Sequence, residues 1–186
     1  KGARGITAFL VERGTPGFRV GRHLEKMGLR TSPMAELFFD ECEIPVENRS
    51  PQQIYLGAEQ LLADGEPREA GKLFSEVERL YPYSEWAKRA MLMSAFAYHE
   101  GAQYAESRAA AERYLEFFPA DVDAPYAQFL IALSYYDQIV DIGRDQANTF
   151  EALQEMRDII ERYPDSDYAV SAQLKFELAL DHLAGK

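Results

Sequence analysis

The first fifty residues contain the side chains that most often take part in chemistry: the single cysteine, one of the three histidines and a glycine-rich turn. Cys42 is the only cysteine, so no internal disulfide can form, and we interpret it as a buried strand residue rather than a reactive thiol. His23 has no His, Cys or paired acid close to it in the sequence, which favours a solvated loop histidine over a metal ligand. The stretch RGTPGFRVG, residues 13–21, lacks the glycine spacing of a dinucleotide fingerprint and the Gly-Lys-Ser/Thr ending of a P-loop. We therefore predict no catalytic residue, no metal site and no cofactor.

Charge and glycine are distributed unevenly along the 186 residues. Residues 1–50 hold 8 Lys/Arg and 7 Asp/Glu, whereas residues 51–186 hold 12 and 24, so nearly all of the net charge of −11 comes from the second segment. The acidic balance argues against a nucleic-acid partner, because phosphates are bound by cationic side chains. No apolar run approaches the ~20 residues of a membrane span, and no signal peptide opens the sequence. The abrupt change of composition predicts two segments, residues 1–50 and 51–186.

Short strands and glycine turns are predicted in the first segment. GITAFLVE (5–12) has the composition of a strand, Gly14 and Gly17 bracket a turn before a second strand with Phe18 and Val20, and MAELFFDECEIP (34–45) predicts a third. The alternation of apolar residues in the third strand is imperfect, which indicates a bulge or an edge position. The prediction is a short β segment.

MGLRTSPMAELFFDECEIPVEN, residues 27–48, carries a specific resemblance. With the residues before it, this stretch resembles part of the middle β-domain of acyl-CoA dehydrogenases, close to the isovaleryl-CoA type. In that family the domain forms one wall of the flavin site, and a following helical domain supplies the catalytic glutamate. The resemblance covers neither the flavin-contacting strand nor that helical domain, so it implies an incomplete β segment without a catalytic role.

The second segment repeats itself. ERLYPYSEWA (78–87) and ERYPDSDYA (161–169) are two copies of one phrase, and FFPADVDAPYA (117–127) is a looser third copy. In each copy an aromatic residue and a proline end one helix, and the next helix begins shortly afterwards. The expected N-cap residues are Ser84, Ser166 and Asp123. The stretch VDIGRDQAN (140–148) predicts an extended loop inside the third unit.

Between the prolines, small residues recur at the spacing of tetratricopeptide repeats, in which two antiparallel helices occupy about 34 residues. Only Ala, Gly or Ser lets two helix backbones approach closely, and stacked units bury one continuous core. The sequence therefore predicts a mainly α fold: a tetratricopeptide-repeat solenoid of about three helix pairs plus a further helix at 168–183, preceded by the β segment. The predicted packing residues are Ala58, Ala70, Phe74, Ala95, Tyr98, Ser107, Ala111, Tyr114, Ala132, Tyr135, Ala152 and Met156.

In such a solenoid the first helix of each pair lines a concave groove. Aromatic and aliphatic side chains in a groove suit a bound peptide that is held by a few pocketed side chains, although most tyrosines are expected to be core residues. The predicted groove residues are Tyr55, Glu59, Leu62, Leu92, Phe96, His99, Phe129, Leu133 and Tyr136.

Three stretches of the second segment carry a further resemblance: residues 50–87, IALSYYDQIVDIGRDQ (131–146) and IIERYPDSDYA (159–169). They resemble the BamD family, the periplasmic lipoproteins of the outer-membrane β-barrel assembly machinery, in its alphaproteobacterial form. The resemblance implies a non-enzymatic scaffold at the periplasmic face of the outer membrane. Its partners would be the other assembly subunits and the C-terminal segments of unfolded outer-membrane proteins. It also leads us to expect that the family's lipid anchor and about two further repeats lie outside this sequence.

The two resemblances concern unrelated proteins. We therefore interpret the chain as a chimera joined near Arg49–Pro51. An assembly scaffold is the function that the longer segment favours, and a catalytically incomplete fragment of a flavin-dependent acyl-CoA dehydrogenase is the alternative that the shorter segment leaves open. A generic tetratricopeptide adaptor would keep the fold and change the partner.

Overall fold

The computed structural model describes residues 11, 13–24, 34–40, 46–139 and 146–184. The chain divides into two compact units, residues 1–50 and 51–186, and each is described by itself. The predicted strand at 5–12 and Cys42 lie outside the described residues, apart from residue 11.

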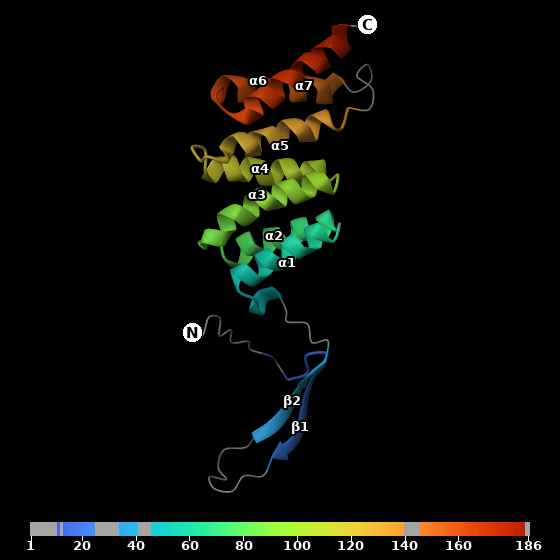
Figure 1. Ribbon diagram of the computed structural model, residues 1–186, viewed down its shortest axis with the longest axis vertical. Coiled ribbons are helices and arrows are strands. Elements are labelled where there is room, and N and C mark those ends of the chain that lie inside the picture. The colour runs from blue at the N-terminus through green and yellow to red at the C-terminus, as the bar shows by residue number, and fades with distance from the viewer. Residues whose placement is uncertain (1–10, 12, 25–33, 41–45, 140–145, 185–186) are drawn as a thin grey trace. The chain divides into compact units, whose positions relative to one another are not determined.

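The first unit contains a two-stranded antiparallel sheet formed by β1 (Phe18–Leu24) and β2 (Met34–Phe39), as Figure 1 shows. Phe18 pairs with Phe39, and their ring centroids lie 5.2 Å apart. The register shifts between Val20 and His23, so the bulge lies in β1 rather than in the later strand. In the described two-stranded sheet β2 is an edge strand, which is the other alternative that the sequence left open. His23 belongs to β1 and is not the loop histidine that the sequence predicted.

Two features of this sheet follow from glycine. Gly14 and Gly17 have φ of 105° and 78°, values that L side chains rarely adopt, which confirms the predicted glycine turn. At Gly21 a Cβ atom would lie 2.6 Å from the ring of Phe38, so the cross-strand aromatic ring occupies the space of a missing side chain. A short 3-10 helix, Val46–Asn48, ends this unit.

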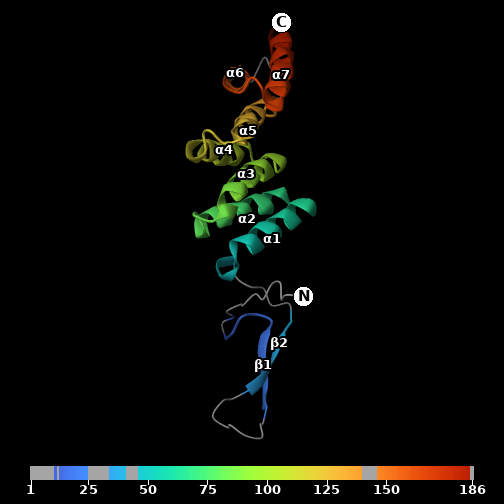
Figure 2. The same cartoon turned by 60° about the vertical axis from the view of Figure 1, so that its left-hand side comes forward.

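The second unit is a stack of seven helices that follow one another in chain order (Figures 1 and 2). Each helix packs on the next, and α1, α3, α5 and α7 also contact one another in succession. This is the arrangement of the predicted tetratricopeptide-repeat solenoid, with three helix pairs and a further helix. The bounds are α1 Pro51–Ala63, α2 Pro67–Leu80, α3 Glu85–Glu100, α4 Tyr104–Phe117, α5 Ala124–Tyr136, α6 Gln146–Arg162 and α7 Asp167–Ala184.

Local signals explain most helix ends. The side chain of Ser84 accepts a hydrogen bond of 3.1 Å from the N–H of Ala87, and Ser166 accepts one of the same length from Ala169, which confirms both predicted N-caps. Asp123 stands at the N-cap position of α5, but its side chain makes no capping bond, so the expected cap is wrong.

The connections between helices are short and have identifiable causes. Gly65 turns the chain between α1 and α2 with φ of 82°, and Ala102 adopts φ of 55° in the turn between α3 and α4. The loop predicted at 140–148 ends earlier than expected, because Gln146 already belongs to α6. Residues 140–145 lie outside the described residues.

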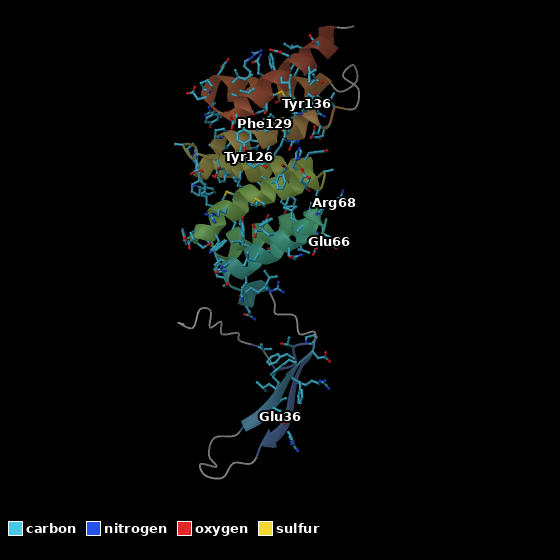
Figure 3. All side chains as sticks on the ribbon, in the orientation of Figure 1. Glu36, Glu66, Arg68, Tyr126, Phe129 and Tyr136 are labelled. Carbon is cyan, nitrogen blue, oxygen red and sulfur yellow. The ribbon has the colours of Figure 1, made fainter. Side chains whose placement is uncertain are left out.

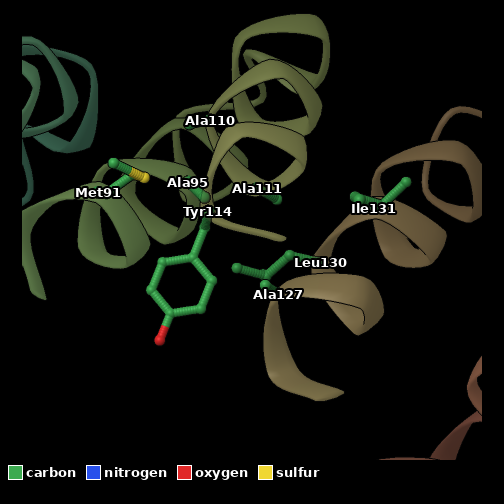
Figure 4. Close-up of a cluster of buried hydrophobic side chains, with 8 residues drawn as sticks. All are labelled: Met91, Ala95, Ala110, Ala111, Tyr114, Ala127, Leu130 and Ile131. Atoms are coloured by element: carbon green, nitrogen blue, oxygen red, sulfur yellow. The ribbon is translucent and has the colours of Figure 1, made fainter. Parts of the chain in front are cut away.

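Small side chains bring the helices together, as the repeat pattern predicted. One core cluster joins α3, α4 and α5 around the fully buried Tyr114 (Figure 4). A second cluster joins α5, α6 and α7 around Met156 and Ile159. Of the twelve predicted packing residues, ten are buried, and Tyr98 and Tyr135 are half-buried. The first cluster consists of Met91, Ala95, Ala110, Ala111, Tyr114, Ala127, Leu130 and Ile131.

Candidate polypeptide-binding face

The first helices of the successive pairs form one side of the stack. Because α1, α3, α5 and α7 contact one another in order, their side chains form a continuous surface, which we call the odd-helix face. The nine predicted groove residues all belong to α1, α3 and α5, and each helix contributes three of them at positions i, i+4 and i+7. This spacing places the three residues of one helix on one side of it.

Two of the nine residues belong to the core. Tyr55 is 8% exposed, and its ring lies 5.2 Å from that of Phe74 and 5.1 Å from that of Trp86. Burial, followed by the negative charge of Glu59, raises the pKa of Tyr55. Phe129 is 9% exposed and lies 5.6 Å from the ring of Tyr168. Both side chains therefore support the face from within.

The remaining aromatic and aliphatic members are half-buried and so have one side in contact with the core. Leu92 and Phe96 pack against the first core cluster, and Leu133 and Tyr136 pack against the second. Leu62 is half-buried on α1, and Glu59 is exposed there. Side chains that are fixed by packing on one side and open on the other are suited to apolar contacts with a ligand.

Polar contacts fix the side chains at the C-terminal ends of α3 and α5. His99 Nε2 lies 3.1 Å from Asp137 Oδ2 at the C-cap of α5. The His99 ring also makes an edge contact with Tyr104 at 5.6 Å. The ammonium group of Lys175 lies 4.6 Å from the centre of the Tyr136 ring, which ties α7 to α5.

Sequence reasoning missed an aromatic residue in the first turn of α3, α5 and α7. Trp86, Tyr126 and Tyr168 are half-buried, and each directly precedes a buried alanine of the repeat. The rings of Tyr126 and Tyr168 lie 5.2 Å apart, and burial, followed by the neighbouring Tyr168, raises the pKa of Tyr126 to about 12. Figure 3 shows Tyr126, Phe129 and Tyr136 along α5. An alignment of the three proline phrases would have revealed this aromatic position.

The described residues provide no basis for a metal centre or a membrane span. No group of three His, Cys, Asp or Glu side chains within 13–24, 34–40, 46–139 and 146–184 is arranged to hold a metal ion. None of the helices in the described part of the chain is long and apolar enough to cross a membrane.

Comparisons with known proteins match the two segments of the chain to different kinds of protein. The family model described as "Outer membrane lipoprotein", YfiO, matches residues 47–186. Outer membrane protein assembly factor BamD of Caulobacter vibrioides is 44% identical over 140 residues, and BamD of Rickettsia prowazekii is 36% identical over 119 residues. These matches cover 75% and 64% of this chain. The chain spans about half the length of both relatives, 46% and 47%.

A second, shorter group of relatives consists of acyl-CoA dehydrogenases. Cyclohex-1-ene-1-carbonyl-CoA dehydrogenase of Syntrophus aciditrophicus is 54% identical over 48 residues, which is 26% of this chain and 12% of that protein. Matches to two unrelated kinds of protein are consistent with the chimera that the sequence predicted.

Solved structures support the helical fold. The C-terminal TPR-containing domain of an FK506-binding protein from Plasmodium falciparum superposes with a TM-score of 0.51 at 14% sequence identity, and the match covers 77% of this chain and 95% of that domain. At this identity the likeness shows the fold alone, and it confirms the predicted tetratricopeptide-repeat solenoid.

Proposed function

Because the chain belongs to the outer membrane lipoprotein family of YfiO and BamD, we propose that it is a non-enzymatic scaffold of outer-membrane β-barrel protein assembly. The relatives are named outer membrane protein assembly factors, and a repeat solenoid is an architecture that presents extended binding surfaces. The proposal places the function in residues 51–186 and assigns no catalytic residue.

The odd-helix face is the proposed binding surface. The single observation that carries this choice is the set of half-buried aromatic and aliphatic side chains at the predicted groove positions: Leu62 on α1, Leu92 and Phe96 on α3, and Leu133 and Tyr136 on α5. A peptide that lies across these helices would meet two such side chains on each of α3 and α5. Such contacts concentrate affinity in a few anchored side chains.

The proposed partners follow from the family. They are other subunits of the assembly machinery and the C-terminal segments of unfolded outer-membrane proteins, bound at the periplasmic face of the outer membrane. An extended segment with a terminal aromatic side chain matches the apolar members of the face, such as Phe96 and Leu133.

A titration tests this proposal. The fluorescence of Trp86, the only tryptophan, is followed while a peptide that ends in an aromatic barrel-type signal is added. We expect saturable binding, and we expect Phe96→Ala to weaken it about tenfold, which corresponds to about 1.4 kcal/mol. Phe117→Ala is the matched control, because Phe117 is 63% exposed on α4, outside the odd-helix face.

Two results would overturn the proposal. Equal weakening by both alanine variants would show that the face is not the binding surface. No binding at high micromolar peptide would favour a generic tetratricopeptide adaptor with another partner. Circular dichroism of both variants must show unchanged helix content, since Phe96 also packs against the first core cluster.

The short dehydrogenase match supports a second candidate function. On this alternative the chain is a catalytically incomplete fragment of a flavin-dependent acyl-CoA dehydrogenase. The match involves about a quarter of the chain, whereas the lipoprotein family model matches 140 residues. We therefore prefer the assembly scaffold.

A further inference from the structure

A half-buried cation lies at the end of the odd-helix face that α5 and α7 form. The ammonium group of Lys175 on α7 lies over the ring of Tyr136 on α5, 4.6 Å from its centre. Tyr136 is one of the predicted groove residues, and both side chains are half-buried. The ring attracts the ammonium group without neutralising it, so the contact holds a positive charge at this place on the face.

Lys175 has no carboxylate partner in the described part of the chain. Residues 51–186 hold 24 Asp/Glu and only 12 Lys/Arg, so a cation in this segment is surrounded by an excess of carboxylates. Among the residues that the structure describes, Lys175 nevertheless takes part in no ion pair. Its charge is therefore available to a negatively charged group of a ligand.

The other cations of the helices that form the face are accompanied by carboxylates. The Lys and Arg residues in α1, α3, α5 and α7 are Lys88, Arg89 and Lys175. Lys88 pairs with Asp121 in the turn between α4 and α5. Burial and then the charge of Glu59 raise the pKa of Tyr55, whereas the charge of Arg89 lowers it. A carboxylate and a guanidinium thus act on the same hydroxyl group, and the positive charge of Arg89 is offset there.

Apolar side chains continue the odd-helix face on α7. The two copies of the proline phrase align α3 with α7, and in this alignment Leu174 takes the position of Leu92 and Leu178 that of Phe96. Leu174 and Leu178 are 61% and 44% exposed. An aromatic side chain of a ligand next to the ammonium group would therefore meet apolar side chains of α7 as well as those of α5.

Carboxylates occupy other parts of the face. Glu59 is exposed on α1, at the opposite end of the stack from α7. At the C-terminal ends of α3 and α5, the carboxylates of Glu100 and Asp137 lie on either side of the His99 ring. A negatively charged end group of a ligand is therefore favoured beside Lys175 and disfavoured towards α1.

We propose that Lys175 binds the terminal carboxylate of the peptide that occupies the odd-helix face. This inference rests on the proposed function, in which the ligand is the C-terminal segment of an unfolded protein, and it adds the direction in which that segment lies. The terminal aromatic side chain packs beside Tyr136, the carboxylate pairs with the ammonium group, and the preceding residues run towards α3 and α1. The ion pair selects a chain end over an internal apolar segment, which has no terminal carboxylate.

Fluorescence anisotropy of a labelled peptide of about ten residues that ends in phenylalanine tests the inference on the full chain. The peptide is titrated once with a free C-terminal carboxylate and once as the C-terminal amide. We expect the amide to bind about fivefold more weakly, and we expect this difference to shrink as NaCl is raised from 50 to 300 mM, because salt screens a partly exposed ion pair. Lys175→Met is expected to abolish the preference, so that both peptides bind alike.

Two further variants serve as controls for the role of the charge. Lys175→Arg keeps a cation beside Tyr136 and is expected to retain the preference for the free carboxylate. Arg89→Gln removes one positive charge from an exposed position on α3 and is expected to change the ratio of the two affinities by less than twofold. Phe96→Ala is expected to weaken both peptides to the same degree, since it removes an apolar contact and no charge.

The proposed function and the role of Lys175 fail in different ways. Absence of saturable binding of either peptide would overturn the proposed function and this inference with it. Equal affinity of the unaltered chain for the two peptides would overturn only the assignment of Lys175. The same conclusion would follow from a preference that persists in Lys175→Met, or from one that Arg89→Gln abolishes as completely as Lys175→Met does.

Discussion

Tyr114 donates a hydrogen bond of 2.7 Å to Asp121 and so joins the end of α4 to the turn that leads into α5. Lys88 of α3 donates to the other carboxylate oxygen of Asp121, and the N–H of Asp123 donates to the same oxygen as Tyr114. One carboxylate therefore connects three consecutive helices. Burial, followed by this hydrogen bond, raises the pKa of Tyr114.

Asp121→Asn is expected to destabilise the helical unit by about 1–3 kcal/mol, because it weakens two side-chain hydrogen bonds and removes an ion pair. Asp123→Asn is the matched control two residues away, where the side chain makes no capping bond, and it should change stability by less than about 0.5 kcal/mol. Urea unfolding followed by circular dichroism measures both. Equal effects would show that the carboxylate of Asp121 has no special role.

The contribution of Asp121 should depend on pH. Hydrogen bonds from Lys88 and then from Tyr114 lower its pKa from 3.8 to about 2. The folded state therefore binds the proton less readily than the unfolded state, and the stabilisation is complete above pH 3.8 and is lost as the pH falls towards 2. The stability difference between wild type and Asp121→Asn should narrow over this range. A difference that stays constant from pH 5 to pH 2 would contradict this account.

Gly71→Ala is expected to destabilise the stack by about 1–3 kcal/mol, because the new methyl group would overlap the ring of Tyr98. Gly57→Ala is the control in α1, where the nearest atom, from Leu73, lies 3.5 Å away, an ordinary contact. There the gain in helix propensity should leave stability unchanged or raise it by up to about 1 kcal/mol. Thermal unfolding distinguishes the two, and a stabilised Gly71→Ala variant would show that Tyr98 is free to move.

A fragment of residues 51–186 is expected to fold alone, with a melting temperature within a few degrees of that of the full chain. The reason is that the seven helices form a compact unit with core clusters of their own. Differential scanning calorimetry of both proteins provides the comparison. A melting temperature that is much lower in the fragment would show that residues 1–50 stabilise the solenoid.

The purified protein is expected to contain no bound flavin, because the assembly scaffold needs none. Absorbance between 350 and 500 nm provides the measurement. A tightly bound flavin that is bleached by an acyl-CoA would reverse the preference between the two proposed functions.

Features that depend on local sequence could be predicted, and those that depend on distant partners could not. Ser84 and Ser166 are caps because the serine and the backbone N–H that donates to it lie within one helical turn. Asp123 was expected to act in the same way, but Asp121 organises that turn through Lys88, a residue 33 positions earlier. No local pattern indicates such a contact.

The same limit applies to the odd-helix face. Helical spacing placed Tyr55 and Phe129 with the other groove residues, but Tyr55 packs on Phe74 and Trp86, and Phe129 packs on Tyr168. Their burial depends on the angle at which neighbouring helices cross, which side-chain spacing along one helix does not determine. The helices that carry the nine residues were thus predictable from the repeat, whereas the exposure of each residue was not.

The succession of helix contacts has a kinetic consequence. Almost all helix partners in residues 51–186 are adjacent or next but one in the chain, so the average loop that must close is short. Low contact order favours fast folding, and neighbouring pairs can form as they leave the ribosome, before the rest of the stack has been synthesised.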